Sequence, residues 1–195
     1  MLKTLILASA SPRRRQLLQQ LGLSFTVLAA DIDEAALVRE GELSPVEQAL
    51  HLAELKARAV QEQLKEGLII AADTVVWCGD HALGKPSDNA EARRMLQMLS
   101  GRAHLVVTGL CLMDCVSGVW ETAAECTEVF FRELTAADIE AYIATGEPHD
   151  KAGAYGIQGY GAIFVEAIAG CYYNVMGLPL NRLCRMLGNF GVSVL

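Results

Sequence analysis

The sequence predicts a single α/β domain, in which short apolar strands alternate with amphipathic helices. Three observations predict this class. The strand and helix patterns alternate along the chain, no linker or repeat interrupts its 195 residues, and 52% of the residues are hydrophobic against 20% charged. A chain of this length buries a sizeable core. We therefore expect residues 1–195 to fold as one domain.

Turn and capping residues set the expected boundaries in the first half of the chain. Ser11 and Pro12 favour a helix start, as do Ser44 and Pro45. The polar pair Asp73-Thr74 interrupts an apolar run and predicts two short strands there. The predicted elements are a strand at 3–8, a helix at 12–21, a strand at 25–28, an acidic loop at 31–43, a helix at 45–64, strands at 68–72 and 75–78, and a helix capped by Ser87 that ends near 99.

The second half is predicted from similar signals. Ser117-Gly118 indicates a turn between two long strands, and Thr135 with Asp138 three residues later resembles a capping box. The predicted elements are strands at 103–113 and 119–131, a helix through 143, a strand at 163–168 within glycine-rich loops, and a last helix after Pro179.

Charge and cysteine usage limit the possible partners. The chain has a formal net charge of −7, yet its first thirty residues hold Lys3, Arg13, Arg14 and Arg15 and no acid. A local basic segment in an acidic protein favours a small anionic ligand, because duplex nucleic acid requires a broad basic face. No segment resembles a secretory signal or a membrane span. The six cysteines form no CxxC pair, so we expect reduced thiols and a cytoplasmic protein.

Residues 8–15, Ala-Ser-Ala-Ser-Pro-Arg-Arg-Arg, are the most informative segment. Because Ser11 caps the helix, the arginines fall in its first turn, where the helix dipole already presents positive charge. An anion should compensate them there, and a phosphate chain is the obvious candidate.

Carboxylates and lysines supply further candidates, each with a plainer alternative. Asp73 follows a buried run, where a carboxylate is costly unless it is paired, protonated or bound to metal; otherwise it bonds its own turn. Glu34 lies in a polar loop and is either a metal ligand or a solvated acid. Lys56 falls on a helix, where a solvated face is the default. Lys85, held between Gly84 and Pro86, is a candidate anion contact.

A glycine-rich segment at 150–159 could approach a ligand closely, or form only a structural turn. It matches neither a Walker loop nor the dinucleotide fingerprint. Gln158 is its most informative side chain, because an amide pairs with a base edge through one donor and one acceptor. The aromatic residues Tyr172 and Tyr173 could stack on a base, but packing against the core is the expected arrangement.

Together these segments resemble the Maf family of nucleotide pyrophosphatases over nearly the whole chain. The matching motifs, in family order, are Ala8-Ser-Ala-Ser-Pro-Arg-Arg14, Asp33-Glu34, Lys56-Ala57, Ala72-Asp-Thr-Val-Val76, Gly84-Lys-Pro86, Asp150 to Gly159 and Asn174-Val-Met-Gly-Leu-Pro179. One departure is Leu55, where the family usually has Glu.

The resemblance implies a long mixed β-sheet flanked by helices, related to inosine triphosphate pyrophosphatases, and metal-dependent cleavage of a nucleoside triphosphate. Asp73 would be the general base and, with Glu34, would place a divalent cation, Mg²⁺ or Mn²⁺. The residues implied to hold the phosphates are Ser9, Arg13, Arg14, Lys56 and Lys85. A homodimer is also plausible from the family.

The subgroup resemblance concerns the base. The chain resembles the dTTP/UTP-cleaving branch, which pairs Arg13 with Asp73-Thr74 and Ile157-Gln158. A neutral Gln amide suits uracil or thymine, whereas a carboxylate suits a cationic methylated guanine. Arg13, Thr74 and Gln158 are thus the candidate specificity residues. The alternatives are a house-cleaning enzyme for modified purine triphosphates, such as 7-methyl-GTP or ITP, and a nucleotide-binding regulator of septum formation.

Overall fold

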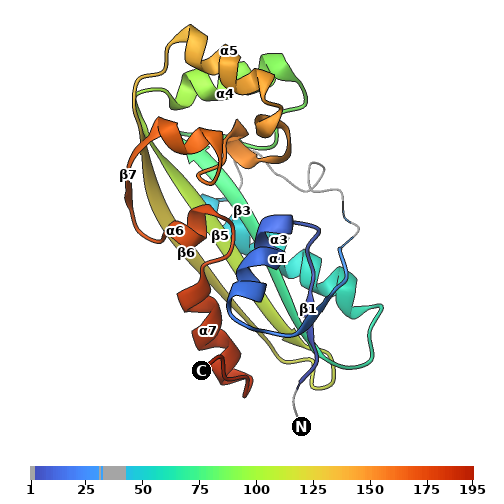
Figure 1. The fold of residues 1–195 in the computed structure, drawn as a ribbon. Coiled ribbons are helices and arrows are strands. Elements are labelled where there is room, and N and C mark those ends of the chain that lie inside the picture. Colours follow the sequence, from blue (N-terminus) through green and yellow to red (C-terminus); the bar gives the residue numbers. More distant parts are fainter. Residues whose placement is uncertain (1–2, 31, 33–42) are drawn as a thin grey trace.

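The computed structural model describes residues 3–30, 32 and 43–195. One seven-stranded mixed sheet crosses the molecule (Figure 1). Its strands are β1 (Leu5–Leu7), β2 (Phe25–Val27), β3 (Leu68–Cys78), β4 (His81–Leu83), β5 (Ala103–Asp114), β6 (Trp120–Phe131) and β7 (Val165–Ala169). Six of them lie in the order β2-β1-β3-β5-β6-β7. The seventh, β4, is outside this order and pairs with β3. Strand β1 runs parallel to β2 and β3, and the other pairs are antiparallel. The predicted α/β class with a long mixed sheet is confirmed.

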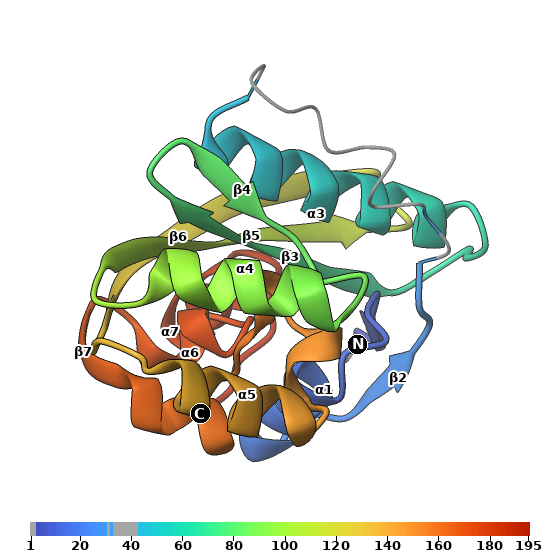
Figure 2. The same cartoon turned by 90° about the horizontal axis from the view of Figure 1, so that it is seen from above.

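Helices cover both faces of this sheet. They are α1 (Pro12–Gln20), α3 (Pro45–Gln61), α4 (Asn89–Leu99), α5 (Ala136–Ala144), α6 (Tyr172–Val175) and α7 (Leu180–Asn189), with 3₁₀ turns η1 (Glu147–Asp150), η2 (Ala152–Ala154) and η3 (Tyr160–Phe164). Viewed from above, α3 is the one described helix that covers one face, while α1, α4, α5 and α7 lie on the other (Figure 2).

Strand β3 is continuous, so the predicted break at Asp73-Thr74 is wrong. Both residues stay in register with β5, Asp73 opposite Gly109 and Thr74 opposite Thr108. Successive side chains of a strand point to opposite faces. Ile69 and Ala71 accordingly pack with α3, whereas Ile70 packs with α1 and α7. The polar pair continues this alternation, which directs Asp73 toward α3 and Thr74 toward α1.

A close approach of α3 to the sheet depends on Gly109. A Cβ atom at this position would lie 2.3 Å from the carbonyl oxygen of Ala49 in α3. Gly109 is the β5 partner of Asp73, so this close approach occurs on the strand next to that carboxylate. The helix face turned inward is apolar except at Gln48 and Lys56, and its buried residues are Gln48, Ala49, Leu52, Ala53, Lys56, Ala57 and Val60.

Local signals gave most helix starts correctly. Ser11 caps α1, Ser44 caps α3 and Thr135 caps α5, as predicted. The predicted cap at Ser87 is wrong: Asp88 caps α4, and Ser87 donates to the Glu91 carboxylate from outside the helix.

Other predicted boundaries also shift. The strand expected at 3–8 spans Leu5–Leu7. The helix expected to reach residue 64 ends at Gln61. The strand expected from residue 163 begins at Val165, after the 3₁₀ turn η3.

All six cysteines carry free thiols. Cys78 and Cys111 are buried, and burial raises the pKa of Cys111 to about 12, whereas Cys126 is exposed. Within the described residues, no helix combines the length and apolar character needed to cross a membrane.

Candidate active site

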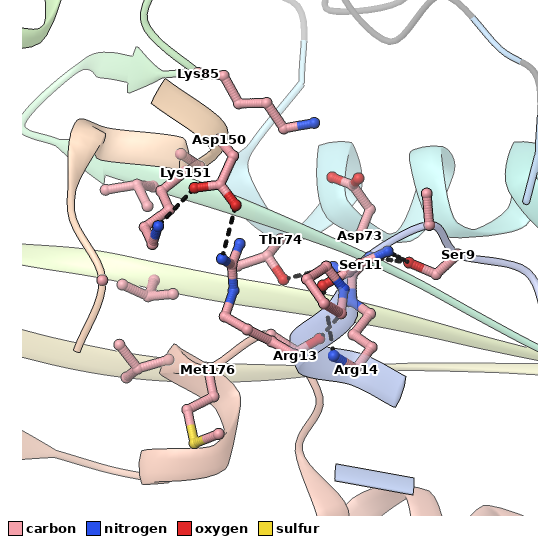
Figure 3. A pocket seen from close by; sticks show the side chains of 18 of the residues that line it. Ser9, Ser11, Arg13, Arg14, Asp73, Thr74, Lys85, Asp150, Lys151 and Met176 are labelled. Atoms are coloured by element: carbon pink, nitrogen blue, oxygen red, sulfur yellow. Dashed lines mark hydrogen bonds and ion pairs between the residues drawn. The ribbon is translucent and has the colours of Figure 1, made fainter. Parts of the chain in front are cut away.

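A pocket of about 320 Å³ opens between the β1–α1 turn, the middle of β3 and the segment after α5 (Figure 3). It contains every predicted site residue that the structure describes, namely Ser9, Arg13, Arg14, Lys56, Asp73, Thr74, Lys85 and Gln158. These residues come from positions up to 149 apart in the sequence, so the fold brings the sequence motifs together. Glu34, the predicted second metal ligand, lies outside the described residues.

Asp73 and Lys56 form a buried ion pair on the α3 side of the sheet. Lys56 Nζ donates to Asp73 Oδ1 at 2.5 Å, and the two residues are only 6% and 5% exposed. The solvated helix face expected by default for Lys56 is therefore wrong. Removing two charges from water is costly, so a buried pair at this place indicates a functional role and not a stabilising one.

Arg14 is buried on the opposite side of β3 and ties three segments together. Its Nε donates to the Gly177 carbonyl at 2.8 Å, its Nη1 to Ser9 Oγ at 3.2 Å and its Nη2 to Thr74 Oγ1 at 2.9 Å. Thr74 Oγ1 also lies 2.9 Å from Thr108 Oγ1. The guanidinium thus joins α1, β3 and the loop after α6 at the floor of the pocket.

Arg13 points across the pocket mouth. Its Nη1 lies 3.1 Å from Asp150 Oδ2, and Lys151 Nζ lies 2.5 Å from Asp150 Oδ1. Burial raises the pKa of the Asp150 carboxyl, but hydrogen bonding and charge from Lys151 and Arg13 outweigh burial and hold that pKa below its ordinary value. The pair links α1 to the segment after α5 through charges that a ligand phosphate could also engage.

Lys85 extends from the wall opposite the arginines (Figure 3). Its loop is tied to the glycine-rich segment, because Gly153 N–H donates to the Gly84 carbonyl at 3.0 Å. Gly153 has φ +70°, and a Cβ there would lie 3.0 Å from Val76 Cγ1. Only glycine fits this close contact without strain, so the two loops are held as one wall.

Gln158 is exposed and lies in a turn that Glu147 holds from behind. The Glu147 carboxylate accepts hydrogen bonds from the backbone N–H groups of Tyr160, at 2.9 Å, and Gly161, at 3.3 Å. Sequence reasoning missed Glu147. The glycine spacing indicates either room for a ligand or a structural turn, and neither interpretation names Glu147 as the group that the turn surrounds.

Tyr172 and Tyr173 differ in their packing. Tyr173 packs against the core, as expected. Tyr172 is 39% exposed, so core packing is wrong for this residue.

The charge around the pocket favours an anion. Among the described residues, five cations line it against two carboxylates. They are Arg13, Arg14, Lys56, Lys85 and Lys151 against Asp73 and Asp150. Such an excess in a concave site concentrates anionic ligands. A chain of phosphates matches both the number and the spread of these cations.

The donor set also fits a divalent cation that arrives with phosphates. Mg²⁺ is typically held by one or two carboxylates together with phosphate oxygens and water. Asp73 is such a carboxylate, at the base of the pocket. No cluster of three or more His, Cys, Asp or Glu side chains occurs in the described part of the chain, so an all-protein cage is not what these residues offer.

Comparisons with known proteins agree with the motifs. A family model described as "Maf-like protein" matches residues 4–190. A relative from Pelotomaculum thermopropionicum, named dTTP/UTP pyrophosphatase, is 49% identical over 194 residues and covers 100% of both chains. One of the same name from Moorella thermoacetica is 50% identical over 190 residues, which is 97% of this chain and 96% of the relative.

Among solved structures, a HAM1 protein from Coxiella burnetii aligns with a TM-score of 0.48 at 16% identity, over 96% of this chain and 100% of the other. The family match and the full-length relatives are decisive. The chain belongs to the Maf family.

Proposed function

We propose that this protein is a nucleoside triphosphate pyrophosphatase that hydrolyses dTTP and UTP, and modified pyrimidine triphosphates, to the monophosphate and pyrophosphate. The observation that carries the proposal is the buried Lys56–Asp73 pair at the base of a pocket lined by further cations. A carboxylate in that position can take a proton, and the cations can hold a triphosphate. Full-length relatives are named for this activity.

In the proposed reaction, a water oxygen attacks the α-phosphorus and its proton passes to a carboxylate oxygen of Asp73. The bond from the α-phosphorus to the α–β bridging oxygen breaks, and pyrophosphate leaves with that oxygen. Lys56 and Lys85 stabilise the negative charge that develops on the phosphates. Ser9 and Arg14 bind the phosphate chain from the β1–α1 side of the pocket.

Base recognition is assigned to Gln158, Arg13 and Thr74. The Gln158 amide donates to O4 and accepts from N3–H of uracil or thymine. Arg13 and Thr74 complete the specificity set. A site built on such polar contacts rejects a mismatched edge by up to roughly 10⁴-fold, whereas one methyl changes binding by only about 1–3 kcal/mol. Thymine and uracil nucleotides are therefore both accepted.

A divalent cation, Mg²⁺ or Mn²⁺, fits the same proposal. Asp73 would hold it, with Glu34 as the second carboxylate predicted from the sequence. When bound, such a cation neutralises phosphate charge and polarises the attacked phosphorus. We also propose that residues 1–195 act as one domain in the cytoplasm. The homodimer expected from the family stays a prediction, which sedimentation velocity would check.

Pyrophosphate release from the purified full-length chain tests the function. With Mg²⁺ present, dTTP and UTP should release pyrophosphate, and removal of the metal with EDTA should abolish the release. Faster turnover of ITP or 7-methyl-GTP than of dTTP would favour the modified-purine enzyme. Nucleotide binding without any release would favour the regulator of septum formation.

A further inference from the structure

The carboxylate of Glu147 lies inside the turn formed by residues 156–161, here called the glycine turn. Its Oε2 accepts from Tyr160 N at 2.9 Å, and its Oε1 accepts from Gly161 N at 3.3 Å. Oε1 also accepts from the hydroxyl of Tyr142 at 2.9 Å, and that hydroxyl accepts from Gly156 N at 3.2 Å. One side chain of η1 therefore holds both ends of the glycine turn.

The glycines of this turn are required by that carboxylate. A Cβ on Gly159, whose φ is +117°, would lie 2.7 Å from Glu147 Oε2. A Cβ on Gly156 would lie 2.7 Å from Lys151 Cε and 3.2 Å from Glu147 Oε1. At Gly159 the positive φ and this contact together exclude any larger residue, whereas at Gly156 a larger residue would have to displace the flexible end of Lys151. The backbone is wrapped around Glu147, and the glycine spacing follows from this packing.

Gln158 lies between the two points where the turn is held. It is exposed, lines the pocket, and belongs to neither a helix nor a strand. No regular backbone ladder fixes it. The turn that carries it is held by hydrogen bonds at Gly156, Tyr160 and Gly161 and by the packing of Ile157 against the core. Glu147 accepts the bonds from Tyr160 and Gly161 directly. The bond from Gly156 is accepted by the Tyr142 hydroxyl, which in turn donates to Glu147.

We infer that Glu147 is a positioning residue for base recognition: it holds the glycine turn so that the Gln158 amide stands in the pocket wall. The inference rests on the proposed function, because it presumes that Gln158 contacts the base. An ionised carboxylate suits this position, since both of its oxygens only accept hydrogen bonds. Hydrogen bonds to a charged acceptor are also stronger than neutral ones.

The substitution Glu147→Gln is nearly isosteric and tests this directly. The amide keeps one accepting oxygen, but its NH₂ group then faces a donor, the Tyr160 N–H or the Tyr142 hydroxyl. Glu62→Gln is the matched control, because Glu62 is exposed and does not line the pocket. Tyr142→Phe is a milder variant: it removes the hydroxyl that links Gly156 N to Glu147 Oε1, but it keeps the Glu147 bonds to Tyr160 and Gly161.

Selectivity is the main measurement, taken as kcat/KM for dTTP divided by kcat/KM for dCTP, whose base presents the opposite donor and acceptor pattern. We expect Glu147→Gln to lower this ratio by about tenfold, the equivalent of one lost hydrogen bond. The loss should lie in KM for dTTP and not in kcat. Glu62→Gln should leave the ratio unchanged, and Tyr142→Phe should fall between them.

A double-mutant cycle separates positioning from general damage. In a Gln158→Ala background, Glu147→Gln should produce no further loss of selectivity. An equal loss in both backgrounds, or an unchanged ratio in an active Glu147→Gln enzyme, overturns the inference while leaving the proposed function intact.

Hydrogen exchange supplies a readout that needs no turnover. The amides of Gly156, Tyr160 and Gly161 should exchange at least about tenfold faster in Glu147→Gln than in the Glu62→Gln control. Unchanged exchange overturns the inference. If the unsubstituted chain cleaves none of the triphosphates, the proposed function fails and the base-recognition part of the inference fails with it.

Discussion

The ammonium of Lys56 and the carboxylate of Asp73 meet 2.5 Å apart between α3 and β3, and each side chain is less than a tenth exposed. A well-packed apolar pair of similar volume would often be neutral or more stable, because burying two charges costs several kcal/mol. Buried ionisable pairs that lower stability in this way are typical of functional sites.

Asp73→Asn should remove catalysis while preserving the fold. Asn fills the same volume and still accepts a hydrogen bond from Lys56, but it cannot take the proton of the attacking water. We expect kcat to fall by at least about 10³-fold, within the range that general base and electrostatic effects supply. Pyrophosphate release measures the loss, and circular dichroism checks the fold. Near-normal turnover would refute the assignment of Asp73 as the base.

Lys56→Met should lower stability as well as activity, because it leaves the Asp73 carboxylate buried without this ammonium. We expect a loss of about 3 kcal/mol in the free energy of unfolding, measured by urea denaturation. Adding Asp73→Asn to Lys56→Met should recover part of the loss. Lys65→Met, at an exposed position, is the control and should change little. No recovery in the double variant would argue against a direct pair.

Gly109→Ala should displace α3 from the sheet. The added methyl group would lie 2.3 Å from the Ala49 carbonyl oxygen, and overpacking of this kind costs typically about 1–3 kcal/mol. Activity should fall too, because the same helix carries Lys56 to Asp73. Gly188→Ala is the matched control, since a Cβ there has nothing within 4 Å. Thermal unfolding of the two variants compares them, and equal melting temperatures would contradict the close approach.

His104 should make the fold sensitive to mild acid. It is 3% exposed, and burial lowers its pKa to about 4 from an ordinary value of 6.5. The unfolded chain therefore binds a proton between these values that the folded chain does not. Stability from this residue is complete above pH 6.5 and declines as pH falls toward 4, by up to about 3 kcal/mol.

This pH dependence is measured by denaturant unfolding at pH 7 and pH 4.5. His104→Gln should lose most of the stability difference between the two conditions, whereas exposed His81→Gln should keep it. The acidic residues of the chain also titrate in this range, but both variants retain them. An identical pH slope in His104→Gln and the unsubstituted chain would show that His104 does not contribute.

Gln158→Glu should alter substrate choice more than overall rate. A carboxylate at this position only accepts hydrogen bonds, so it no longer donates to O4 of uracil or thymine. We expect kcat/KM for dTTP and UTP to fall by about tenfold or more. The ratio to 7-methyl-GTP should shift toward the methylated purine. Equal losses on all three substrates would count against base recognition by Gln158.

Local features were predictable because their partners are near in sequence. Ser11 and Pro12 begin α1 as expected, since a cap bonds only to its own first turn. Asp73 was correctly selected as a pocket residue, but its polarity was interpreted as the end of a strand. A polar side chain inside a strand can be accommodated by a partner on the helix that covers that face. The sequence alone does not show that Lys56 is this partner for Asp73.

Long-range contacts explain the remaining errors. Lys56 is buried because Gly109, more than fifty positions later, lets the helix approach the sheet. Arg14 donates a hydrogen bond to Gly177, which lies 163 residues later in the chain. No local sequence pattern predicts a contact over that separation. Glu147 was missed because its partners include backbone N–H groups, which every residue except proline carries and which leave no mark in the sequence.

The continuity of β3 has a mechanical consequence. Asp73 sits six residues into an eleven-residue strand that pairs with β5 on both sides of it, and such central backbone opens only when the whole domain unfolds. Under the proposed function, the Asp73 carboxylate therefore keeps a fixed position through the reaction cycle. The nucleotide is the partner that moves into line, and the acid does not move to meet it.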